Sequence, residues 1–115
     1  MVDVSFPAAG EFRQLLVDTG ADVSVAPRDL AERSGLVWES GEAIMMRGVS
    51  PKPECRVEGR LLETELIVLP SEWRMTVPVL YADGDVPLLA GRRGFLDRML
   101  VAANGRRKIT RLTLL

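Results

Sequence analysis

The residue types best suited to chemistry in this chain occur together in one short stretch, Asp18-Thr19-Gly20-Ala21-Asp22. The stretch directly follows the apolar run Leu15-Leu16-Val17, which predicts a short buried strand. A carboxylate at the point where a strand leaves the core is held rigidly, and Gly20 allows a sharp turn or the close approach of a ligand. An ordinary strand followed by a hydrogen-bonded turn has the same pattern, so this stretch needs support from the rest of the chain.

The chain lacks the residues that many other catalytic sites use. It contains no histidine, which excludes Ser-His-Asp and Cys-His catalysis and most zinc sites. Cys55 is the single cysteine, which excludes an internal disulfide and a thiolate metal cluster, and there is no glycine-rich phosphate-binding loop. We therefore expect no metal and no cofactor. Catalysis would depend mainly on carboxylates, Arg, Lys, Ser, Thr or Tyr.

Asp18 is a strong catalytic candidate only as half of a pair. Two facing carboxylates share one proton, because like charges a few ångström apart cannot both ionise near neutral pH. The ionised carboxylate takes a proton from water, and the protonated one gives its proton to the substrate. Asp-Thr-Gly occurs once in the chain, so the second Asp18 would come from another copy across a two-fold axis. Dimer formation is then part of the mechanism.

Composition narrows the class of protein further. The 115 residues allow one domain, and 47% hydrophobic with 27% charged residues is ordinary for a globular protein. The net charge of −1 argues against general binding of nucleic acid or anionic membranes. No apolar run approaches a membrane span, and residues 1–10 lack the pattern of a signal peptide. The expectation is a cytoplasmic protein, or a domain excised from a longer one.

Alternating apolar residues predict a protein built from short strands and hairpins. The first predicted hairpin joins Val2–Phe6 to Glu11–Val17. A second hairpin, with arms at 42–49 and 55–62, projects a proline-containing tip at 50–54. The last one joins 100–103 to 108–115 through a two-residue turn at Asn104-Gly105. Further strands are predicted at 23–26, 63–69 and 74–81, with a strand start at 36–38 and an apolar run at 86–91.

Short helices are expected at two places. Pro27 opens the first helix, which Gly35 ends, and residues 92–99 form the second with Phe95, Leu96 and Met99 facing inward. The predicted architecture is one all-β domain over residues 1–115. It has eight or nine short strands in a closed or folded sheet and one or two short helices.

The sequence resembles the retropepsin-like aspartic proteases, the family of retroviral proteases and their cellular and bacterial relatives. Leu15-Leu16-Val17-Asp18-Thr19-Gly20-Ala21-Asp22 is similar to the family's signature of apolar residues followed by Asp-Thr-Gly-Ala. Leu88-Leu89-Ala90-Gly91-Arg92 resembles the apolar-apolar-Gly-Arg stretch near the family's C-terminal helix. The order of the elements between these motifs also matches, and the resemblance spans most of the chain.

The resemblance implies a retropepsin-like barrel acting as a homodimeric endopeptidase on a peptide or protein substrate. Asp18 would be the catalytic carboxylate, Thr19 would bond across the dimer axis, and Gly20 would offer its backbone to substrate. Asp22 would orient the substrate backbone or pair with Arg92. The remaining support positions of the two motifs and the flap are Ala21, Gly48, Val49 and Gly91. The hairpin at 44–62 would be the flap that closes over bound peptide.

Three departures from the family pattern leave alternatives open. The tip Gly48-Val49-Ser50-Pro51-Lys52-Pro53 replaces a glycine-rich flap tip. Either the flap backbone does not approach substrate closely, or Gly48 makes this approach in place of the tip. Gly94 stands as an insertion before Phe95, so either Arg92 or Arg93 could meet Asp22. The N-terminus begins close to the first strand, so dimer closure could differ from that of the viral enzymes. Either Val2–Phe6 or 108–115 could supply the strands that close the dimer. The alternative functions are a catalytically silent dimerisation or peptide-binding module, and an unrelated small β-barrel with a chance Asp-Thr-Gly.

Overall fold

The computed structural model describes the backbone of residues 1–46, 57–104 and 109–114 and the side chains of residues 1–45 and 58–99. Most of the described residues lie in strands, which confirms the all-β prediction. The strands are β1 (Val2–Phe6), β2 (Glu11–Val17), β3 (Ser24–Pro27), β4 (Glu42–Met46), β5 (Val57–Val68), β6 (Trp73–Ala82), β7 (Leu89–Ala90), β8 (Met99–Asn104) and β9 (Ile109–Leu114). The helical elements are α1 (Arg28–Arg33) and the 3₁₀ turns η1 (Trp38–Ser40) and η2 (Leu96–Arg98). None of the described helices is long and apolar enough to cross a membrane.

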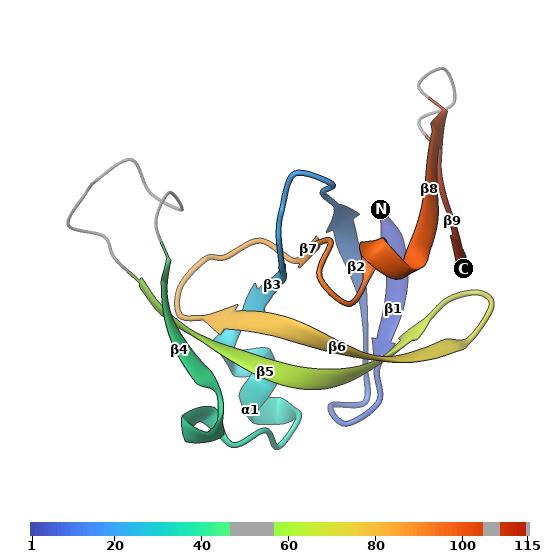
Figure 1. Cartoon of the computed structure of the whole chain (residues 1–115). Helices are drawn as coiled ribbons and strands as arrows, with labels where there is room; N and C mark the ends of the chain where they lie inside the picture. The colour runs from blue at the N-terminus through green and yellow to red at the C-terminus, as the bar shows by residue number, and fades with distance from the viewer. Residues whose placement is uncertain (47–56, 105–108, 115) are drawn as a thin grey trace.

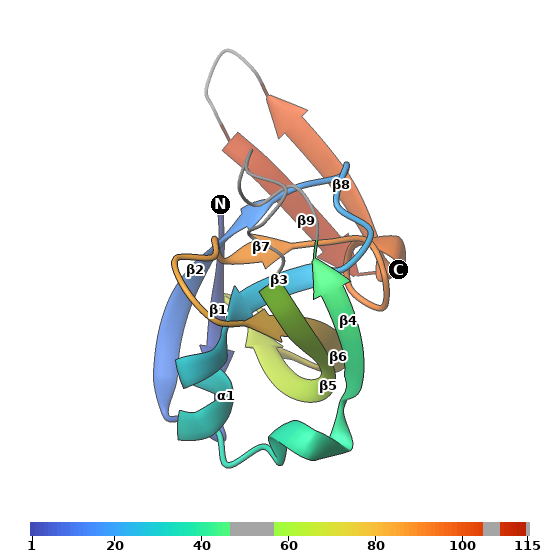
Figure 2. The ribbon, with the colours of Figure 1, turned by 90° about the vertical axis from the view of Figure 1, so that its left-hand side faces the viewer.

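One sheet closes on itself to form the body of the protein (Figure 1). Its strand order is β1-β2-β7-β3-β6-β5-β4, and an extra pairing between β1 and β5 closes six of these strands into a barrel. β4 lies outside the closed ring, paired with β5. β8 and β9 form a separate two-stranded sheet, which projects from the barrel in both ribbon views (Figures 1 and 2).

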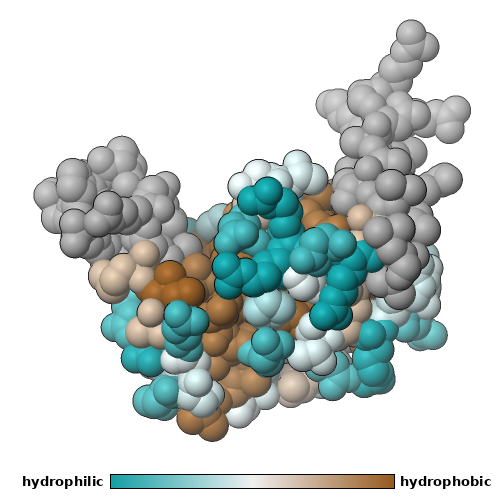
Figure 3. Space-filling model, in the orientation of Figure 1, coloured by the Kyte–Doolittle hydropathy of each residue, from teal (hydrophilic) through white to brown (hydrophobic). Residues whose placement is uncertain are grey.

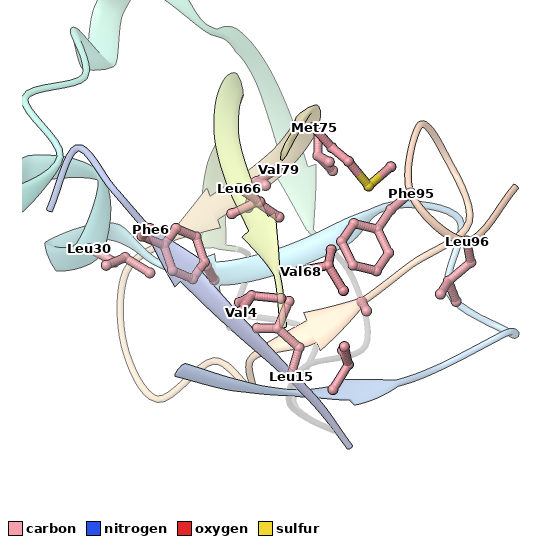
Figure 4. Close-up of a cluster of buried hydrophobic side chains, with 14 of the residues drawn as sticks. Val4, Phe6, Leu15, Leu30, Leu66, Val68, Met75, Val79, Phe95 and Leu96 are labelled. Atoms are coloured by element: carbon pink, nitrogen blue, oxygen red, sulfur yellow. The ribbon is translucent and has the colours of Figure 1, made fainter. Parts of the chain in front are cut away.

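The barrel encloses one apolar core (Figure 4). Alternation places Val2, Val4 and Phe6 of β1 inward, as predicted, and these side chains are at most 7% exposed. They pack against residues from β2, α1, β5, β6 and the segment around η2, and Figure 4 shows Leu15, Leu30, Leu66, Val68, Met75, Val79, Phe95 and Leu96 around them. Residues far apart in sequence therefore share a single core.

The structure corrects several predicted boundaries. The strand expected at 63–69 is continuous with the arm expected at 55–62, because Leu62, Thr64, Leu66 and Val68 point inward in unbroken alternation along β5. The segment 36–38 does not start a strand. It enters η1, where the Ser40 hydroxyl donates a hydrogen bond to the Val37 carbonyl at 2.6 Å.

The helix boundaries differ as well. Pro27 has extended geometry as the last residue of β3, so α1 begins one residue later at Arg28. The helix expected at 92–99 is reduced to the turn η2, because Gly94 adopts a positive φ of 66° that a continuing helix cannot contain. Phe95, Leu96 and Met99 are nevertheless buried, as predicted.

The C-terminal hairpin has a longer connection than the predicted two-residue turn. Asn104 still belongs to β8 and pairs with Ile109, so the connection covers 105–108. The tip of the predicted flap hairpin lies outside the described residues. Its two arms pair antiparallel from Glu42↔Leu61 to Met46↔Val57, which agrees with the predicted hairpin.

One buried polar pair joins β5 to β6 inside the barrel. The Tyr81 hydroxyl and Thr64 Oγ1 are 2.8 Å apart, and Thr64 also donates to the Leu62 carbonyl at 3.2 Å. Burial raises the pKa of Tyr81 to about 12, and the hydrogen bond with Thr64 opposes this rise. A buried hydroxyl that must stay protonated makes the barrel sensitive to high pH.

We expect stability to fall in alkaline solution through this tyrosine. Because the pKa of Tyr81 in the folded state lies above its ordinary value of 10.0, its contribution is complete below pH 10 and is lost as pH rises to about 12. The loss should reach about 2 to 3 kcal/mol, since one pKa unit is ~1.4 kcal/mol. Urea unfolding followed by tryptophan fluorescence between pH 8 and 12.5 measures it.

Tyr81→Phe is the matched control for this prediction. It should cost about 1 kcal/mol at neutral pH for the lost hydrogen bond and remove the extra alkaline loss. Tyr81 is the single tyrosine, so tyrosinate absorbance follows its ionisation directly. Parallel pH profiles for the two proteins would contradict the assignment.

Candidate active site

Asp18 lies immediately after β2, where the main chain is held on both sides. Val17 pairs with Ala90 of β7 in parallel register, and the Asp18 N–H donates to the Ala90 carbonyl at 3.0 Å. The Asp18 carbonyl in turn accepts a hydrogen bond from the Ala21 N–H at 3.1 Å. These backbone contacts fix the point at which the Asp18 side chain leaves the sheet.

The carboxylate of Asp18 is oriented by its own loop. Its Oδ1 accepts a hydrogen bond from the Gly20 N–H at 3.0 Å, as in an Asx turn. A Cβ at position 20 would lie 3.2 Å from this oxygen, so glycine leaves the carboxylate room. Among the described residues, no group hydrogen-bonds Oδ2. Asp18 is half-buried, and Thr19 and Gly20 at the loop apex are exposed.

A second segment, residues 91–93, packs against this loop. The Arg92 N–H donates to the Ala21 carbonyl at 3.0 Å, and the Arg93 N–H donates to the Asp22 carbonyl at 2.8 Å. Both motifs identified in the sequence are therefore in direct contact. With the Asp18 to Ala90 bond, these contacts fix the loop to the segment that follows β7.

A buried hydrogen bond between Gly91 and Ser24 joins the segment 91–93 to the start of β3. The Gly91 N–H donates to Ser24 Oγ at 2.9 Å, and Ser24 is 2% exposed. A Cβ at Gly91 would lie 2.3 Å from the carbonyl carbon of Val23, which leaves no space for any side chain. Backbone packing therefore requires glycine at position 91. Among the described residues, Ser24 is the one side chain that accepts a hydrogen bond from the Gly91 N–H.

The charged side chains beside the loop settle which arginine meets Asp22. Arg93 Nη2 lies 3.0 Å from Asp22 Oδ2 in a hydrogen bond, whereas Arg92 Nη2 lies 4.0 Å from Asp22 Oδ1. More than half of each of these three side chains is exposed, so the pairs contribute about 1 kcal/mol or less. Figure 3 shows hydrophilic residues gathered in the upper middle of the face where Figure 1 places these loops.

The structure brings most of the predicted site residues together. Residues 18–22 form one loop, and Gly91 and Arg92 lie against it through the backbone contacts above. Gly48 and Val49 lie outside the described residues. In the described part of the chain, no group of three or more His, Cys, Asp or Glu side chains is arranged to hold a metal ion.

Sequence reasoning missed Ser24. The sequence places it only in a short strand at 23–26, where alternation points its side chain away from Val23 and Val25, so the pattern carries no signal of its buried hydrogen bond. Arg93 was an open alternative to Arg92, and the structure gives it the closer contact with Asp22.

Comparison with known proteins does not assign the chain to a family. No protein-family model matches the sequence, and no curated protein matches it.

Replacing Ser24 by alanine tests the contact between the two segments. Ser24→Ala leaves the buried Gly91 N–H without an acceptor, so we expect a loss of about 1 to 3 kcal/mol in unfolding free energy. Ser71→Ala, at an exposed turn, is the matched control and should change stability by less than about 0.5 kcal/mol. Urea titration measures both, and equal small effects would show that the Ser24 bond is not needed.

Proposed function

We propose that this chain is one protomer of an aspartic endopeptidase, with a retropepsin-like fold and an active site made of Asp18 from two copies. The observation that carries the proposal is the geometry of Asp18. Its main chain is fixed to β7, Gly20 orients one carboxylate oxygen, and Thr19 and Gly20 are exposed at the loop apex. Such a loop presents a carboxylate and a hydroxyl to a second identical loop.

The order of the elements supports the same proposal. The family resemblance implies a particular order of elements along the chain, and this chain has that order. It contains the Asp18 loop, then the β4–β5 hairpin, then a glycine-arginine segment that packs against the loop. The all-β barrel provides a rigid support, because the loop leaves one barrel strand and is bonded to another. A site held on strands keeps its groups in place more accurately than a site on free loops.

In the proposed reaction, the two Asp18 carboxyl groups share one proton and bind a water molecule between them. The ionised carboxylate takes a proton from the water as it attacks the carbonyl carbon of the scissile peptide bond. The protonated carboxyl group gives its proton to the carbonyl oxygen, forming a neutral gem-diol that then collapses. The C–N bond breaks as the amine leaves with a proton, and no covalent intermediate with the enzyme forms. The chemistry uses no metal or organic cofactor.

The substrate would be a peptide in extended conformation. β4 is the end strand of the sheet, and among the described residues it pairs with β5 alone, which leaves its other edge open. Extended peptides bind such edges through main-chain hydrogen bonds, and side-chain pockets then set their specificity. The β4–β5 hairpin would cover the bound peptide as a flap.

Asp18→Asn is the direct test of this mechanism. Asparagine keeps an oxygen that can accept the Gly20 N–H, so the fold should survive, while the carboxylate chemistry is removed. We expect cleavage of a mixed peptide library, followed by mass spectrometry, to fall by at least about a hundredfold. Asp85→Asn, at an exposed turn, should leave cleavage unchanged.

A statine-type inhibitor separates catalysis from binding in the same assay. Its hydroxyl group mimics the attacking water, so it should block cleavage by the wild-type protein. Undiminished cleavage by pure Asp18→Asn protein would end the proposal. Binding of the inhibitor with no cleavage by the wild type would instead favour the silent peptide-binding module.

A further inference from the structure

A pocket on the outer face of the barrel lies apart from the Asp18 loop. It has a volume of about 430 Å³, which is within the range of small-molecule sites. Its walls come from β1, the first half of β2 and the end of β5, and the lining residues are Asp3, Phe12, Arg13, Gln14, Leu69 and Pro70. Asp18 follows the opposite end of β2 (Figure 1), so the pocket and the candidate active site are separate places on the molecule.

The walls of the pocket are held by the strand pairing of the barrel. Asp3 pairs with Gln14, and Ser5 pairs with Phe12, across the β1–β2 ladder. The Leu69 N–H donates to the Asp3 carbonyl at 2.9 Å, which keeps the end of β5 against β1. The pocket is therefore formed before any ligand arrives, and binding costs little ordering of the protein.

Phe12 supplies the main apolar surface of the pocket. It alternates along β2 with Leu15, which is 2% exposed in the core, whereas Phe12 points outward and is 73% exposed. Leu69 and Pro70 add aliphatic surface, and the other three lining residues are polar or charged. An apolar area bounded in this way is smaller than the roughly 800 Å² per partner of a stable protein interface, but it suits one ring-bearing small molecule.

The charges around the pocket favour a cation. Arg13 lies 2.6 Å from Glu11, which also pairs with Arg33, and Arg33 holds Asp29 at 2.9 Å. The two arginines and the two carboxylates balance one another, so Arg13 is not free for an anionic ligand. Among the residues that the structure describes, no cationic group lies within ion-pair distance of the Asp3 carboxylate. An unbalanced carboxylate beside an exposed aromatic ring attracts positive charge from two directions.

We propose that this pocket binds a small molecule that joins an aromatic ring to a single ammonium group. The ring packs on Phe12, Leu69 and Pro70, and the ammonium group donates to the Asp3 carboxylate and to the Gln14 side-chain oxygen. Such a ligand buries the exposed aromatic surface and neutralises the one unbalanced charge in the same step. The proposal does not depend on the proposed function.

Three ligands of nearly the same shape test the assignment. The isotope-labelled chain is titrated with 2-(2-naphthyl)ethylamine, with the neutral 2-(2-naphthyl)ethanol and with the anion 2-naphthylacetate, and amide chemical shifts are followed by NMR. We expect saturable shifts at residues 3, 12, 14 and 69. The amine should bind at least about tenfold more tightly than the carboxylate, because Asp3 attracts the first and repels the second.

Two variants separate the apolar contact from the charge. Phe12→Ala should weaken all three ligands by at least about tenfold, since it removes the aromatic wall. Asp3→Asn should remove the preference for the amine over the alcohol and leave the affinity for the alcohol unchanged. Val37→Ala is the matched control, because Val37 is 62% exposed and lies outside the pocket, and it should bind as the wild type does. Urea unfolding followed by tryptophan fluorescence checks that each variant folds.

Several results would overturn the proposal. Equal affinity for the amine and the carboxylate would do so, as would shifts confined to other residues or no saturable shift up to about 5 mM amine. Tighter binding of acetyl-Phe-Lys-amide than of the naphthyl amine would assign the pocket to a protein segment instead. Asp18→Asn should bind the amine like the wild type, so the failure of the proposed function leaves this result unaffected.

Discussion

The position of Asp18 depends on hydrogen bonding between two short backbone segments, 16–22 and 88–93. The Leu16, Asp18, Arg92 and Arg93 N–H groups all donate across this contact, at 2.8 to 3.0 Å. Gly91 allows the segments to meet, because the carbonyl of Val23 occupies the space where a side chain would begin. A bulkier residue there would force the two segments apart and move the carboxylate.

The barrel makes this contact possible. Bonding Ser24 to Gly91 joins positions 67 residues apart in sequence, and closing so long a loop costs chain entropy. That cost is offset by the shared apolar core, in which β1, β2, β5, β6 and the segment around η2 bury side chains against one another. Closure of the sheet through β1 and β5 leaves the Asp18 loop on a rigid support, while the exposed ion pairs of Asp22 add little to it.

A single chain already positions its half of the site we propose, because the Asp18 carboxylate is oriented within that chain. The carboxylate is oriented from one side by Gly20, while the loop apex is exposed where a second loop could meet it. The hairpin of β8 and β9 extends the same rigid segment that holds the loop.

Local patterns were sufficient for much of this description. Alternation in Val2–Phe6 and Glu11–Val17 determined the first hairpin, and the order Asp-Thr-Gly after an apolar run located the loop, because these features depend on near neighbours alone. The sequence could not show that 55–69 contains one continuous strand arm, that Gly94 interrupts a helix, or that Arg93 is closer than Arg92 to Asp22. Those outcomes depend on packing and on backbone angles in the assembled barrel.

The sequence by itself determined which residue carries the candidate chemistry and that it occurs once per chain. Only the tertiary structure decided that the Ser24 to Gly91 hydrogen bond supports the Asp18 loop. It also decided that β1 pairs within the barrel, whereas β8 and β9 form a separate sheet. Contacts between such distant segments form only when the core brings them together.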